Sequence, residues 1–224
     1  MNGYENGEPT LLQKTSLERD LGIQISNNLK SSAQANHAAT NANRKLGLLK
    51  KTFRFRGVDM WKKLYTAYVR PHLEFAVPVW NPYTEEDINT LEKIQRRATK
   101  ISHNLKKFKY DQRCDILELT SLKERRVRGD LIQKFKIENK LDVVNWPYEP
   151  ICGQPRGGHR GHFKREIIKN CAQRYNFFNN RIASEWNKLP NEIIAAKTVN
   201  SFKNLLDAYR KDMRSKLPQA VIYC

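Results

Sequence analysis

The sequence predicts a mainly α fold: a helical bundle in the first half, a small β segment before it and a second α-rich module after it. Apolar residues recur at helical spacing in several long segments, and helix-capping residues precede two of them. Strand-like alternation is confined to Leu21–Ser26. We therefore expect strands within residues 1–28, a bundle over 29–109 and the second module over 110–224.

The first half is expected to hold three or four helices, of which three can be placed. Residues 29–53 place an apolar stripe on one side of a helix: Ala35, Ala39, Ala42, Leu46, Leu49 and Phe53. Asp59 can cap a second helix, which should end or kink at Arg70-Pro71. Thr84 and Asp87 resemble a capping box for a third helix running to about Ile101. One face of this third helix is apolar, and the other carries Lys93, Arg96, Arg97 and Lys100.

The second half is expected to be helical on both sides of a loop. A short helix is predicted over Tyr110–Leu119, and Ser121 with Glu124 forms a capping box for a helix over Leu122–Asn139. Glycines and prolines are concentrated at 144–161, which predicts a loop. Phe163–Cys171 reads as a strand or the start of a helix. Further helices are predicted over Asn176–Lys188 and Thr198–Lys216.

The charge balance narrows the class of partner. Lys and Arg number 41 against 23 Asp and Glu, a net charge of +18. Such a surplus repels itself unless a polyanion relieves it, so we expect RNA and/or DNA as the partner. An anionic membrane surface ranks lower, because the apolar helix faces are needed for the core. No run of about 18 apolar residues indicates a membrane span.

Two basic segments supply the candidate nucleic-acid-binding residues, because cations on rigid helices can neutralise successive phosphates. The candidates are Arg44, Lys51, Arg54, Arg56, Lys93, Arg96, Arg97, Lys100, Lys106 and Lys107. The alternative is a solvated helix face. Interleaved aromatic residues could stack on bases, although core packing is favoured for them: Phe53, Phe55, Trp61, Tyr65 and Tyr68. A third basic cluster, Arg156–Arg174, is as well explained by a flexible loop.

No catalytic or metal-binding pattern stands out. The acidic run Glu85-Glu86-Asp87 is best explained as helix capping. A zinc site is not expected, since common zinc sites pair closely spaced cysteines and this chain offers only the set Cys152, His159, His162 and Cys171. Cysteines without a C-x-x-C pair and the lack of a signal peptide favour a reduced intracellular protein, nuclear or cytoplasmic.

Ordered blocks of the sequence resemble the reverse transcriptases of LINE-type, jockey-like retrotransposons. The matching blocks are Asp20–Ile23 with Ser26 and Leu29-Lys30, Leu64-Tyr65, Val69–Ala76, Val79–Tyr83, Leu91–Lys100, Tyr110 with Arg113, Ser121-Leu122 with Glu124–Arg126, Arg128–Leu131, Arg160–His162, Phe177-Phe178 with Arg181, Trp186–Pro190 and Phe202-Lys203. They span roughly residues 17 to 210 in order.

The resemblance implies a place in a larger polymerase. Residues 1–28 would be the last palm strands, 29–109 a helical thumb, and 110–224 the carboxy-terminal region. The paired catalytic aspartates that bind Mg²⁺ are missing, as is the family's endonuclease. We therefore expect a chain that is inactive alone, needs no cofactor of its own and associates with the missing palm and fingers.

The expected function is non-catalytic binding of template–primer or element RNA through basic helix faces. Two alternatives remain open. One is a freestanding, domesticated nucleic-acid-binding protein descended from such an element, and the other is a decayed fragment with no selected role.

Overall fold

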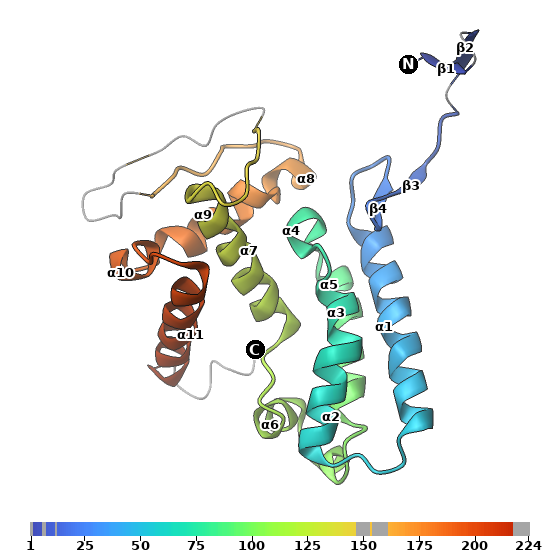
Figure 1. The fold of residues 1–224 in the computed structure, drawn as a ribbon, viewed down its shortest axis with the longest axis vertical. Helices are drawn as coiled ribbons and strands as arrows, with labels where there is room; N and C mark the ends of the chain where they lie inside the picture. The colour runs from blue at the N-terminus through green and yellow to red at the C-terminus, as the bar shows by residue number, and fades with distance from the viewer. Residues whose placement is uncertain (1, 6–7, 12, 147–152, 154–160, 217–224) are drawn as a thin grey trace.

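The computed structural model describes residues 2–5, 8–11, 13–146, 153 and 161–216 (Figure 1). It is mainly helical, as predicted, with short antiparallel strands near the amino terminus: β1 (Asn2–Glu5) pairs with β2 (Glu8–Leu11), and β3 (Leu17–Asp20) with β4 (Ile23–Ser26). The strand expected to begin at Leu21 begins instead at Ile23. Leu21 and Gly22 both have positive φ, 46° and 85°, and form the turn of the β3–β4 hairpin.

Two helices lying side by side form the centre of the first module (Figure 1). They are α1 (Ser32–Thr52) and α5 (Glu85–Thr99). Small buried side chains on α1, such as Ala35 and Ala42, allow close approach, and α5 contributes Leu91 and Ala98. Thr84 caps α5 as predicted, with its hydroxyl accepting the Asp87 N–H at 3.3 Å.

The second predicted helix, expected to end or kink at Arg70-Pro71, does not end there but is interrupted just before it. Here α2 (Val58–Leu64) continues through a π-helical turn, η1 (Tyr65–Val69), into α3 (Arg70–Glu74). The Arg70 N–H donates to the Tyr65 carbonyl five residues back, and Pro71 falls in the first turn of α3, where a missing N–H costs little. The expected cap at Asp59 is also wrong. Gly57 holds that position, and Asp59 lies in the first turn.

Short elements link α3 to the second module. After α4 (Val77–Trp80) and α5 come a 3-10 turn, η2 (Leu105–Lys107), then α6 (Tyr110–Ile116) and α7 (Leu122–Glu138). The Ser121 hydroxyl caps α7 as predicted, accepting the Glu124 N–H at 3.2 Å.

The second module builds its own core on the carboxy-terminal half of α7. It contains α8 (Ala172–Tyr175), α9 (Phe178–Asn187), α10 (Asn191–Ile194) and α11 (Val199–Lys216). Phe135 of α7 stacks on Phe202 of α11 with 4.3 Å between ring centroids. Residues 164–170 form neither the strand nor the helix considered for Phe163–Cys171. Most of the predicted loop at 144–161 lies outside the described residues.

One helix belongs to both cores. Leu122, at the start of α7, packs in the first hydrophobic cluster, whereas Leu131 and Phe135 pack in the second. The domain boundary expected at residue 109 stays a prediction, since the buried side chains change cluster only within α7. No helix in the described part of the chain is long and apolar enough to cross a membrane.

Candidate nucleic-acid interface

A cleft of about 400 Å³ opens between α1 and the carboxy-terminal end of α5. Five cationic side chains line it, together with Asn43, Leu46, Gly47 and Ile101; the cations are Lys50, Arg56, Arg97, Lys100 and Lys106. None of the residues that line it in the described structure is acidic. Like charges around a concave, partly desolvated surface create a strongly positive potential, which an anion would relieve.

Arg56 is fixed in this cleft by backbone contacts. Its Nε donates to the Phe53 carbonyl at 2.8 Å and its Nη2 to the Lys50 carbonyl at 2.9 Å. These bonds satisfy carbonyls at the carboxy-terminal end of α1 that lack helical partners. The Arg56 carbonyl in turn accepts the His103 N–H at 2.9 Å. The loop after α1 is thereby tied to the turn after α5.

A second contact joins the two helices directly. Arg97 Nη1 on α5 donates to Asn43 Oδ1 on α1 at 2.6 Å. A neutral amide thus orients the guanidinium, whereas a carboxylate in the same place would cancel its charge. The cleft therefore keeps its full positive charge.

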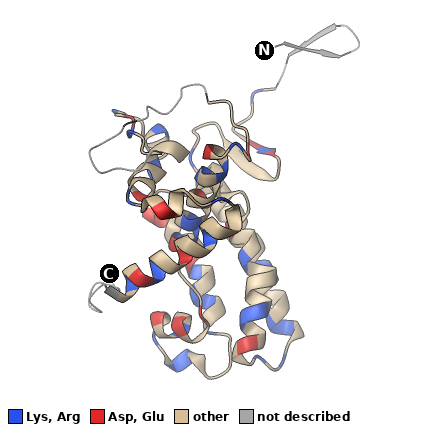
Figure 2. Cartoon of the chain, turned by 60° about the vertical axis from the view of Figure 1, so that its left-hand side comes forward, with Lys and Arg blue, Asp and Glu red and all other residues tan. Residues whose placement is uncertain are grey.

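The structure brings some predicted residues together and leaves others apart. Arg56, Arg97, Lys100 and Lys106 share the cleft. The other six predicted residues are exposed but do not line it: Arg44, Lys51, Arg54, Lys93, Arg96 and Lys107. Figure 2 shows Lys and Arg distributed along the helices of both modules.

Two of these six also contact aromatic rings. The Arg96 guanidinium lies 4.8 Å from the centre of the Tyr110 ring. The Lys107 ammonium lies 5.5 Å from the centre of the Phe108 ring. Such cation–π contacts orient exposed cations without neutralising them.

Sequence reasoning missed Lys50 and Asn43 as site residues. Their signal was available: Asn43, Gly47 and Lys50 follow one another at helical spacing and so share a face of α1. What the pattern could not supply was the position of α5 against that face.

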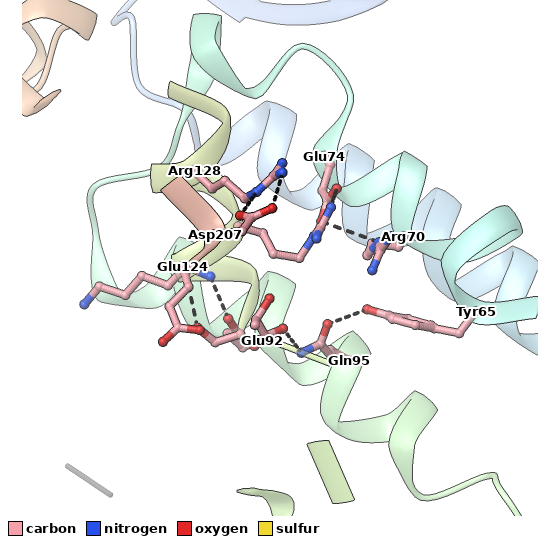
Figure 3. Close-up of polar contacts among 12 residues, drawn as sticks. Tyr65, Arg70, Glu74, Glu92, Gln95, Glu124, Arg128 and Asp207 are labelled. Atoms are coloured by element: carbon pink, nitrogen blue, oxygen red, sulfur yellow. Dashed lines mark hydrogen bonds and ion pairs between the residues drawn. The ribbon is translucent and has the colours of Figure 1, made fainter. Parts of the chain in front are cut away.

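Several acidic side chains form polar contacts between helices of the protein (Figure 3). The buried Glu92 accepts hydrogen bonds at 3.0 Å from the Tyr110 hydroxyl and from the Lys123 N–H. Glu74 holds Arg125 in a two-pronged pair, and this hydrogen bonding raises the pKa of Arg125. Among the residues that the structure describes, none of the acids pairs with a cation of the cleft.

The interleaved aromatics divide into core and surface. Trp61 and Tyr65 are fully buried, as the core interpretation predicts, and Tyr65 donates to Gln95 Oε1 at 2.8 Å. Phe53 is half-buried against the same core. Phe55 and Tyr68 remain 73% and 58% exposed. Of the five, these two are the exposed rings that could meet a base.

The third basic cluster is only partly described. Arg156 and Arg160 lie outside the described residues, as do Cys152 and His159 of the zinc set. Arg174 pairs with Glu166 at 2.6 Å. No group of three His, Cys, Asp or Glu suited to a metal occurs among the residues that the structure describes.

A second, larger cavity of about 680 Å³ lies where the β3–β4 hairpin and α4 face the second module. Its walls are largely apolar and include Ile25, Val79, Trp146 and Phe177. Three cationic residues line this cavity, Lys30, Arg174 and Arg181, but Arg174 pairs with Glu166 and Arg181 with Asp130. The acid-free cleft between α1 and α5 is therefore the better candidate for an anionic polymer.

Comparison with known proteins gives one relative of unstated function. No protein-family model matches the chain, and no solved structure matches it. The chain is similar to an uncharacterized protein of Caenorhabditis elegans, with 29% identity over 111 residues. The match covers 48% of this chain and 56% of the relative, so the chain spans little more than half of the relative's length.

Proposed function

We propose that this chain binds nucleic acid through the sugar–phosphate backbone, without reading base sequence. The acid-free cleft with its five cations is the observation that supports this most directly. Lys and Arg neutralise phosphates and release condensed counterions, which gives binding that depends steeply on salt. No side-chain arrangement at the cleft favours one base over another.

A more particular identity is also proposed: the carboxy-terminal part of a LINE-type retrotransposon reverse transcriptase. The ordered sequence blocks support it, and so does a helical bundle that could close over a template–primer. Lacking the paired aspartates, the chain would grip nucleic acid while the palm of the parent enzyme bound Mg²⁺ and polymerised. An intracellular location belongs to the same proposal.

A freestanding binding protein and a decayed fragment remain the alternatives. Sequencing the genomic DNA upstream of Met1 separates them from the polymerase proposal. An in-frame palm with paired aspartates would support the polymerase part, whereas an unrelated or interrupted frame would favour the alternatives.

Nucleic-acid binding is tested by titrating labelled polymers with purified protein at several salt concentrations. With about five or six phosphate contacts, the logarithm of duplex affinity should fall against the logarithm of salt concentration with a slope near −5. Anionic vesicles of matched charge serve as the competing surface. Binding to vesicles and to neither nucleic acid would refute the proposal.

A triple variant tests whether nucleic acid binds at the cleft. R97A/K100A/K106A should make the slope less steep by roughly two to three, because three phosphate contacts are lost. The matched control is K188A/K197A/K211A, which removes the same charge from exposed positions of the second module outside the third basic cluster. Equal effects of the two variants would show that net charge, and not the cleft, sets the affinity.

A further inference from the structure

An exposed aromatic ring directly precedes, in the sequence, a residue that lines the cationic cleft. Phe55 is 73% exposed in the loop between α1 and α2, and its chain neighbour Arg56 lines the cleft. A single exposed apolar side chain needs no explanation by itself. The surroundings of Phe55 make this one informative.

The backbone beneath the ring is held in place. Arg56 is bonded through its guanidinium to the end of α1 and through its carbonyl to His103, so the loop cannot easily swing away. The ring also lies against Gly57, where an added Cβ would come within 3.0 Å of Phe55 Cε1. Glycine therefore permits a close approach that steadies the ring while leaving it open to solvent.

The shape of the cleft adds a second constraint. A duplex is stiff and carries its phosphates on convex ridges, with its bases stacked and paired inside. A single strand is flexible, can bend a phosphate into a concave site between two helices, and presents a free base face for stacking.

Resting on the nucleic-acid binding proposed above, we propose that this site takes an unpaired strand in preference to a duplex. Successive phosphates of the strand contact Arg97, Lys100 and Lys106 in the cleft, and a neighbouring base stacks on Phe55. Stacking tolerates any base, so the preference is for strandedness and not for sequence.

The test compares a labelled single strand with its own duplex, at equal length and at several salt concentrations. The parent should bind the single strand more tightly. Phe55→Leu keeps an apolar side chain but removes the aromatic face, and should weaken single-strand binding roughly tenfold while changing duplex binding less than about twofold. The salt slope should not change, since no charge is removed. Phe55→Tyr keeps an aromatic ring and should therefore keep the preference for the single strand.

Two further variants separate stacking from general surface effects. Tyr68→Leu removes another exposed ring, which lies in η1 and has no chain neighbour that lines the cleft, and should leave both affinities unchanged. Gly57→Ala displaces the Phe55 ring without removing it, and should give an intermediate loss on the single strand.

The possible outcomes distinguish the strand preference from the nucleic-acid binding on which it rests. If the parent binds the duplex at least as tightly as the single strand, the strand preference is wrong and backbone binding stands. If the parent prefers the single strand, but Phe55→Leu leaves its affinity unaffected or weakens both polymers equally, stacking on Phe55 is wrong and backbone binding stands. If the parent binds neither polymer, both proposals fail.

Discussion

The hydrogen bond from Arg97 Nη1 to Asn43 Oδ1, 2.6 Å long, joins α5 to α1 at the wall of the cationic cleft. An uncharged partner here orients the guanidinium and leaves its charge intact. The contact thus links helix packing to the electrostatics of the candidate site.

Asn43→Asp should weaken nucleic-acid binding, because a carboxylate of nearly the same shape would neutralise Arg97. We expect the salt slope of the affinity to lose about one unit, corresponding to one phosphate contact. Asn43→Ala is the control: it removes the hydrogen bond but adds no charge, and should leave the slope unchanged. A slope unaffected in Asn43→Asp would mean that Arg97 does not contact phosphate.

Gly47→Ala should raise the free energy of unfolding by about 0.5–1 kcal/mol. Gly47 lies inside α1, where glycine is costly, and an added Cβ meets no atom within 4 Å. Chemical denaturation would measure the gain. Gly129→Ala, at an equally open position in α7, should behave alike, and a loss of stability in Gly47→Ala would show that the space is occupied.

Tyr65 should make folding stability fall in alkali. Burial, aided by the charge of Glu74, raises its pKa above the usual value of 10. Above pH 10 the unfolded chain therefore loses the phenolic proton while the folded protein keeps it, which favours unfolding by about 1.4 kcal/mol per pH unit.

Urea denaturation from pH 9 to 11 would measure this fall. Tyr65→Phe should flatten the decline, whereas Tyr68→Phe at an exposed site should follow the parent. Parallel curves for all three proteins would contradict the burial argument.

Arg126→Met should be neutral to stabilising, by up to about 2 kcal/mol. Arg126 is 3% exposed, and burial lowers its pKa. Its Nη1 and Nη2 atoms are buried and have no hydrogen-bond partner within the described part of the chain. Methionine fills similar space without the desolvation cost of a buried charge. Thermal and chemical denaturation would both report the change, and a marked loss of stability would reveal a favourable charge interaction.

Arg181→Met should have the opposite effect and cost about 3–5 kcal/mol. Arg181 on α9 holds the buried Asp130 of α7 through two hydrogen bonds of 2.9 Å, and also donates to the Pro78 carbonyl at 2.6 Å. Removing the guanidinium leaves the buried Asp130 carboxylate without its cationic partner. The double variant R181M/D130N should recover part of the loss, and its failure to do so would argue against an electrostatic cause.

Local sequence signals predicted most of the long helices. The hydroxyls of Thr84 and Ser121 cap α5 and α7 as expected, because capping depends on residues only three apart. At Arg70-Pro71, where the second helix was expected to end or kink, the helix does not end: a π-helical turn interrupts it just before this position, and the chain continues into α3.

The candidate site was only partly predictable. Periodicity placed Arg97 and Lys100 opposite the apolar face of α5, but the cleft depends on how α1 lies against that helix. The partnership of Asn43 with Arg97 spans 54 residues of sequence, which no local pattern encodes. Arg56 was chosen for its charge, and its second role in closing the end of α1 emerged only from the structure.

The helix α7 couples the unfolding of the two modules. Its first turn packs in one core and its later turns pack in the other. Unfolding of either module would therefore expose apolar side chains of the module next to it. On heating, the two modules should therefore unfold in a single cooperative transition. A strand held at the cleft would, by mass action, also protect Trp186 in the far module from exposure to water.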